Sequence, residues 1–144
     1  MLWGMIFSAV AGALMSIQGV FNTRVSEKIG QWQANILVQA IGLISAIAAL
    51  FIFKGGDFSK LREVNKLYLL GGVIGAAITF TVIRGMSCLG PTLAVSVILI
   101  AQLITASLFD FFGLCGTERL DFHYTKILGV IIMIAGIIIF KLKG

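Results

Sequence analysis

Side-chain amides recur at a four-residue spacing near the ends of two apolar stretches of the sequence. Gln18 and Asn22 form one pair, and Asn35 and Gln39 form the other. Residues four apart share one face of a helix, so each pair would present two amides together. Amides both donate and accept hydrogen bonds, so these residues favour recognition of a polar molecule.

Two later apolar stretches carry further polar side chains. An ionisable side chain at the centre of a bilayer costs at least about 2.5 to 3.5 kcal/mol on insertion scales, so polar groups there need a partner, a wet cavity or a function. The alternative is a hydrogen-bond network that only holds helices together, at about 0.6 kcal/mol per bond. The candidate substrate-binding residues are Gln18, Asn22, Asn35, Gln39, Thr81, Arg84, Ser96 and Gln102.

Residues for catalysis, metal binding or cofactor binding are scarce. His123 is the only histidine, and a lone histidine in a connector is usually a surface residue. Cys88 and Cys115 fall in connectors on opposite sides of the predicted membrane, so no disulfide is expected. The glycine-rich stretches lack the Gly-Lys-Ser/Thr of a phosphate loop. The sequence therefore predicts a protein that is not an enzyme and has no metal site or cofactor.

The composition places these residues in a membrane. Of the 144 residues, 59% are hydrophobic and 12% are charged, against about 25% charged in typical globular domains. The net charge of +5 comes from basic residues in short connectors, which fits contact with anionic lipid and not nucleic-acid binding. The first apolar stretch has no basic segment before it, so we expect it to be a retained span and not a signal peptide.

Five apolar stretches are long enough to cross about 30 Å of hydrocarbon as helices. Polar or glycine-containing connectors separate them, at 23–32, 54–66, 86–90 and 113–123. Four aromatic residues, Trp3, Trp32, Tyr68 and Tyr124, lie near the predicted span ends, where such rings meet the headgroups. We expect one all-α transmembrane domain over 1–144, with spans at about 2–22, 33–53, 67–85, 91–112 and 124–140.

The order of the spans predicts where the polar side chains meet. Spans 1 and 2 form a hairpin, so both amide pairs lie in the same half of the membrane, with the glutamines roughly 6 to 9 Å below the surface. Span 3 enters that half with Thr81 and Arg84, and span 4 leaves it past Ser96 towards Gln102. We expect four helices to converge on one polar zone.

An odd number of spans puts the two termini on opposite faces of the membrane. One face then carries six basic residues and the other five, so the positive-inside bias that normally fixes orientation is nearly absent. Either one loop dominates insertion, or the subunits insert both ways and pair antiparallel, as ten helices with inverted symmetry.

An antiparallel pair would bring Asp110 of one subunit level with Arg84 of the other, so an intersubunit ion pair is possible. The alternative is a solvated Asp110 near the end of span 4. Gly129 and Gly136 stand seven apart in the last span and would form a groove suited to close helix packing between subunits. The alternative is that such small residues only pack the monomer.

Several sequence motifs also resemble a known family. The chain is similar to the five-helix, YdcZ-type branch of the drug/metabolite transporter superfamily, and its last span is similar to the dimer helix of the small multidrug resistance transporters. The motifs are Gln18-Gly19-Val20-Phe21-Asn22, Gly71-Gly72-Val73-Ile74-Gly75-Ala76, Leu89-Gly90-Pro91-Thr92-Leu93, Ala101-Gln102, and Asp110-Phe111-Phe112-Gly113-Leu114-Cys115-Gly116.

The resemblance implies a multi-pass transporter of the bacterial inner membrane, built from two short subunits as an antiparallel homodimer or with a short homologue. Small multidrug resistance transporters keep an acidic residue in their first helix, whereas the nearest polar residue here is Gln18. We therefore expect a subunit that moves a small polar metabolite or drug by alternating access. The alternatives are a non-transporting membrane subunit and a passive channel.

Overall fold

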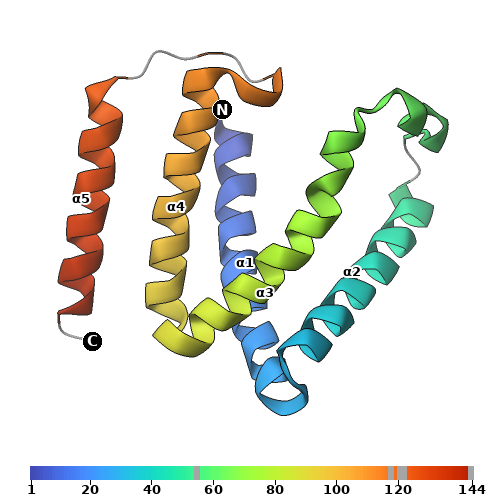
Figure 1. The fold of residues 1–144 in the computed structure, drawn as a ribbon, viewed down its shortest axis with the longest axis horizontal. Helices are drawn as coiled ribbons and strands as arrows, with labels where there is room; N and C mark the ends of the chain where they lie inside the picture. Colours follow the sequence, from blue (N-terminus) through green and yellow to red (C-terminus); the bar gives the residue numbers. More distant parts are fainter. Residues whose placement is uncertain (54–55, 117–118, 120–122, 143–144) are drawn as a thin grey trace. The chain divides into compact units, whose positions relative to one another are not determined.

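The computed structural model describes residues 1–53, 56–116, 119 and 123–142. This part of the chain contains five helices long and apolar enough to cross a membrane (Figure 1). The prediction of an all-helical chain with five potential spans is confirmed. Two basic residues of the charge comparison, Lys54 and Lys143, lie outside the described residues, as do parts of the predicted connectors at 54–66 and 113–123.

The chain divides into two compact units, Met1–Cys88 and Leu89–Gly144. The first unit contains α1 (Leu2–Ile29), α2 (Gln31–Phe53), the 3-10 helices η1 (Phe58–Glu63) and η2 (Lys66–Leu70), and α3 (Gly71–Leu89) up to its penultimate residue. The second contains α4 (Pro91–Phe112), the short 3-10 helix η3 (Leu114–Gly116) and α5 (Tyr124–Lys141).

The junction between α1 and α2 is much shorter than the predicted connector at 23–32. Helix α1 runs to Ile29 and α2 begins at Gln31, so only Gly30 separates them. Polar residues after the apolar stretch continue the helix: Arg24 and Glu27 form an exposed ion pair at 3.1 Å, three residues apart on the helix. Gly30 then turns the chain with a φ of 94°, which glycine adopts without steric cost. The helix ends at this glycine and not where the apolar stretch ends.

The predicted connector at 86–90 is also mostly helical. Helix α3 reaches Leu89, and Gly90, with a φ of 78°, is the single residue before α4. Pro91 occupies the first position of α4, where its missing N–H costs no helical hydrogen bond. The helix starts carry three of the four predicted interfacial aromatics, and Tyr68 lies in η2, just before α3.

The buried core of the first unit lies near the α1–α2 turn. Ala34 from α2 and Ile83 and Met86 from α3 are buried there. Gly19 of α1 leaves room for side chains of α3, because a Cβ at this position would lie 2.8 Å from Met86 Sδ and 3.2 Å from Val82 Cγ1. In the first unit, α3 side chains therefore pack against α1 where Gly19 has no side chain. Small residues of this kind are expected at helix contacts in lipid, where the hydrophobic drive between helices is absent.

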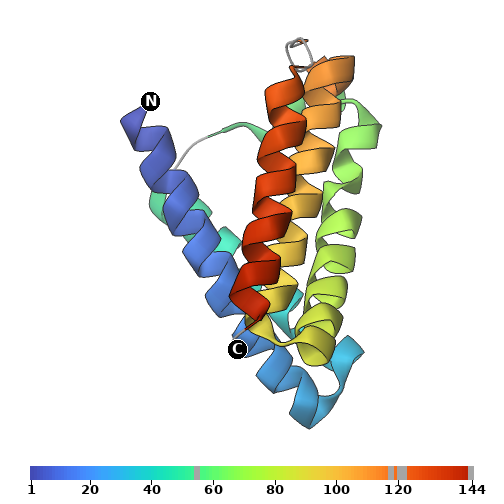
Figure 2. The same ribbon diagram turned by 90° about the vertical axis from the view of Figure 1, so that its left-hand side faces the viewer.

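The second unit is a pair of antiparallel helices. Helix α5 packs along α4 (Figure 2), and Ala94 of α4 is buried. At most 6% of the most apolar window of any of the five helices is buried within the chain. Surfaces this apolar need lipid or another protein to cover them.

We predict that Gly19→Val lowers the free energy of unfolding by about 1 to 3 kcal/mol, because the new side chain displaces Met86 from a well-packed site. Thermal unfolding in detergent micelles measures the effect. Gly12→Val is the matched control, since a Cβ at Gly12 of the same helix meets nothing within 4 Å. Equal destabilisation by both variants would contradict the packing described at Gly19.

Candidate functional site

Two side-chain amides of α2 hold α3 in the first unit. Gln31 Nε2 donates to Phe80 O at 2.8 Å, and Asn35 Nδ2 donates to Ala76 O at 3.0 Å. Donor and acceptor residues are each four apart, so the two bonds join one face of α2 to one face of α3. The rings of Trp32 and Phe80 lie beside them, with centroids 4.4 Å apart. These side-chain contacts link the two helices.

The amide of Asn35 is only half satisfied. The residue is 4% exposed, and its Oδ1 is buried without a hydrogen-bond partner in the described structure. The assignment of oxygen and nitrogen is fixed by chemistry, because the carbonyl of Ala76 can only accept a bond and so must face Nδ2. A buried unpaired acceptor costs about 1 to 3 kcal/mol. Asn35 Oδ1 is therefore a buried acceptor that the described residues leave unpaired.

The predicted amide pair on α1 is divided between the interior and the surface. Asn22 is 8% exposed, whereas Gln18 is exposed. Both line a groove of about 350 Å³ along α1, together with Phe21 and Leu14, so they do share a face as predicted. Thr23 is also buried, and its hydroxyl donates a hydrogen bond to Gly19 O at 2.8 Å. The side-chain amides of Gln18 and Asn22 are therefore the polar groups that line this groove.

The other predicted residues of the first unit lie at its surface. Gln39 and Arg84 are exposed, with no hydrogen bond or ion pair to any described residue. Thr81 is exposed and donates within its own helix, to Ala77 O at 2.9 Å and Ile78 O at 3.0 Å. The hydroxyl is thus satisfied locally, while the amide and the guanidinium need a partner from outside the unit.

Ser96 and Gln102 belong to the second unit. Ser96 donates to Thr92 O at 2.9 Å within α4, and Gln102 is exposed with no bond to the described residues. The structure brings Asn35 together with α3 in the first unit. The convergence of all four helices on one polar zone stays a prediction.

Asp110 has a basic neighbour in its own chain. Its Oδ2 lies 3.9 Å from Lys126 Nζ of α5, and the two side chains are 39% and 32% exposed. The pair with Arg84 of a second subunit stays a prediction, and Lys126 is its competitor. Gly129 and Gly136 have open space around them, since a Cβ at either would meet nothing within 4 Å.

Among the described residues, no cluster of three or more His, Cys, Asp or Glu side chains could hold a metal ion. Cys88 and Cys115 are exposed free thiols. His123 is exposed, and its Nδ1 lies 3.3 Å from Thr125 Oγ1 just before α5.

Two residues outside the predicted site, Gln31 and Lys126, make contacts between helices. Gln31 was assigned to a connector, although its spacing of four from Asn35 marks both as one helical face. Lys126 was counted only as a charge, and its contact with Asp110 depends on how α5 lies along α4. No local pattern in the sequence reveals that register.

These features define a helical membrane protein with polar side chains on its spanning helices, the class to which transporters belong. The chain matches the family described as "Putative inner membrane exporter, YdcZ" over residues 3–139. It belongs to this family, which confirms the resemblance predicted from the motifs. No curated protein and no solved structure matches the chain.

Family membership and the five apolar helices make this a multi-pass protein of the inner membrane and a membrane transporter. The predicted localisation is thereby confirmed. The family is one of transport proteins and not of enzymes.

We predict that Asn35→Leu leaves the free energy of unfolding unchanged or raises it. The variant loses one hydrogen bond, worth about 0.6 kcal/mol in a membrane protein, but also removes an unpaired acceptor that costs about 1 to 3 kcal/mol. Gln31→Leu loses a comparable bond without that gain, so its free energy of unfolding should fall by about 0.6 kcal/mol. Chemical unfolding in detergent micelles compares the two, and a larger loss for Asn35→Leu would contradict the orphan acceptor.

Proposed function

We propose that the protein moves a small polar solute across the inner membrane by alternating access, as one half of a dimer. The observation that carries the proposal is the set of polar groups on apolar helices without a partner in the described structure. These are Asn35 Oδ1, which is buried, and the side chains of Gln39, Arg84 and Gln102, which are exposed. Such groups are costly in lipid and mark substrate pathways in membrane proteins.

The proposed substrate is neutral or anionic. Helices α1, α2, α3 and α5 carry no Asp or Glu among their membrane-spanning residues, and Asp110 of α4 already faces Lys126. Amide groups and one guanidinium suit hydroxyl, carbonyl or carboxylate groups of a solute. A buried carboxylate that exchanges a proton for a cation is not part of the proposal.

The proposed working unit is an antiparallel pair, made of two copies or of this chain and a short homologue. The nearly equal basic counts on the two faces support insertion in both orientations. The open space at Gly129 and Gly136 supports helix packing between subunits, because the described chain leaves these glycines uncovered. Alternating access would then be a rocking of one subunit against the other.

An ion pair between Arg84 and Asp110 of opposite subunits is a further part of the proposal. Arg84 has no carboxylate partner among the described residues, whereas Asp110 is shared with Lys126 at 3.9 Å. We expect Arg84→Glu to weaken the dimer and Arg84→Glu with Asp110→Arg to restore it, as measured by cross-linking in membranes. Failure of the double variant to restore the dimer would contradict the intersubunit ion pair and leave Lys126 as the ionic partner of Asp110.

A non-transporting membrane subunit is the second candidate function. It is favoured by the two amide bonds between α2 and α3, which hold helices together without a solute. A passive channel is the third, and it predicts flux that does not saturate. Saturable flux supports the transporter over both.

Flux into proteoliposomes with a panel of labelled metabolites and drugs tests the proposal. We predict that Gln39→Ala and Gln102→Leu each lower flux of the transported solute about tenfold, the equivalent of one lost polar contact of about 1.4 kcal/mol. Ser45→Ala is the matched control and should leave flux unchanged. Ser45 is exposed on α2, but its hydroxyl already donates a hydrogen bond to Ile41 O at 2.8 Å.

Both variants must remain folded and dimeric for the comparison to count, as measured by size-exclusion chromatography. Saturable flux that all three variants retain would remove these glutamines from the site. Absence of flux for every solute tested would favour the non-transporting subunit.

A further inference from the structure

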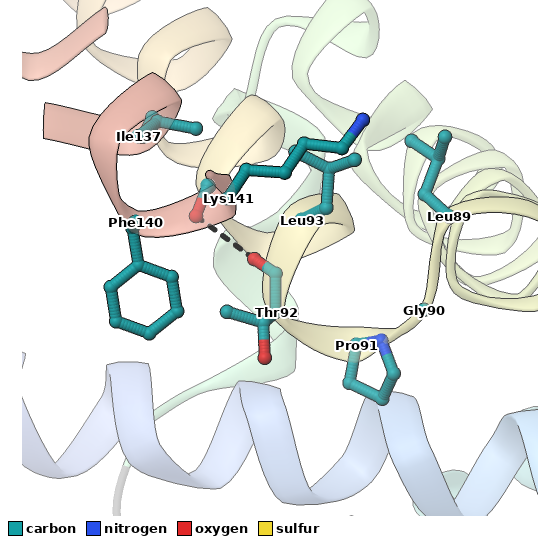
Figure 3. A pocket seen from close by; sticks show the side chains of 9 residues that line it. Leu89, Gly90, Pro91, Thr92, Leu93, Ile137, Phe140 and Lys141 are labelled. Carbon is teal, nitrogen blue, oxygen red and sulfur yellow. Dashed lines mark hydrogen bonds between the residues drawn. The ribbon is translucent and has the colours of Figure 1, made fainter. Parts of the chain in front are cut away.

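A cavity of about 280 Å³ lies in the second unit, between the first turn of α4 and the last turn of α5. Its apolar wall includes Leu89, Leu93 and Phe140, and its polar lining is Thr92, Ser96 and Lys141 (Figure 3). The function proposed above uses none of these residues. The cavity therefore needs its own explanation.

The described residues that line this cavity carry charge of one sign. Lys141 is the charged residue among them, and Figure 3 shows its side chain extending from α5 over Leu93 in the direction of Leu89. No carboxylate among the described residues lies within 4 Å of the Lys141 ammonium group. A lysine held beside an apolar wall without a counter-ion attracts an anion.

The backbone adds to this charge. Gly90 precedes α4 without a side-chain cap, and the first bond of the helix is donated by Ala94 to Gly90 O. The N–H groups of Thr92 and Leu93 therefore precede the helical hydrogen bonds. They stand at the positive end of the α4 dipole.

An apolar groove continues from the cavity along the contact between α4 and α5. This groove, of about 300 Å³, shares Thr92, Ser96, Ile137 and Phe140 with the cavity and adds Leu99 and Met133. Leu99 is eight residues into α4, roughly 12 Å along the helix from Pro91. A positively charged pocket at a span end, followed by an apolar track towards the membrane centre, has the shape of an amphiphile.

We propose that this cavity binds an anionic phospholipid, with the phosphate at Lys141 and the first turn of α4 and one acyl chain along the groove. The ends of two spanning helices lie where lipid headgroups are found. The groove reaches Gly136, so the lipid would border the glycine face of α5. The lipid is bound by the chain itself and is separate from the transported solute.

Native mass spectrometry of the purified protein in detergent, with added phosphatidylglycerol or phosphatidylcholine, tests this site. Phosphatidylglycerol should be retained preferentially, and Lys141→Gln should lower its retention about fivefold. Leu99→Trp should also lower retention, because the indole fills the groove at an exposed position. Lys126→Gln is the matched control, since it removes a lysine from the same helix that already faces Asp110, and its retention should match that of the unmodified protein.

Two results would overturn the site. The first is equal retention of both lipids by the unmodified protein. The second is unchanged phosphatidylglycerol retention in Lys141→Gln. Glycerol phosphate without acyl chains should not compete with the lipid, and full competition by it would assign the pocket to a free anion.

Discussion

The absence of water in the hydrocarbon core is the constraint on which the rest of this structure depends. Every polar group at membrane depth must find its partner within protein or with a bound molecule. The bond from Asn35 Nδ2 to Ala76 O follows from this requirement, and the parallel bond from Gln31 repeats it one turn away. These two amides link α2 to α3, and the side chain of Met86 on α3 packs at Gly19 of α1. Among the buried side-chain atoms of the described residues, Asn35 Oδ1 is left without a hydrogen-bond partner.

The same constraint separates the hydroxyls from the amides. The hydroxyls of Thr81 and Ser96 donate hydrogen bonds to backbone carbonyls of their own helices. Short side chains can reach these carbonyls, so they need no partner on a neighbouring helix. Gln39 and Gln102 have no such local partner among the described residues. Gln39, Gln102 and Arg84 are therefore stronger candidates for solute contact than the hydroxyls of Thr81 and Ser96. The sequence had predicted all five as substrate-binding residues.

Hydropathy was sufficient to predict the number and approximate extent of the helices, because each span must be continuous and apolar. Helix α1 extends beyond the predicted span, since polar residues such as Arg24 and Glu27 continue the helix and Gly30 ends it. The four-residue spacing predicted Gln18 and Asn22 on one helical face, and both line the groove along α1. It could not decide which of the two turns inward, because that depends on the rotation of each helix. The contact between Lys126 and Asp110 depends on register between helices, which no single-helix pattern contains.

The central claim is that the working unit is an inverted pair, and the orientation of the C-terminus tests it most directly. The measurement is labelling of a single cysteine placed at Gly144, in a chain with Cys88→Ser and Cys115→Ser, by a membrane-impermeant maleimide on intact cells. If subunits insert in both orientations, about half of the termini that react in permeabilised cells should react in intact ones. Labelling of all termini or of none would contradict a homodimer of opposite orientations, and with it the pairing of Arg84 with Asp110 between identical chains.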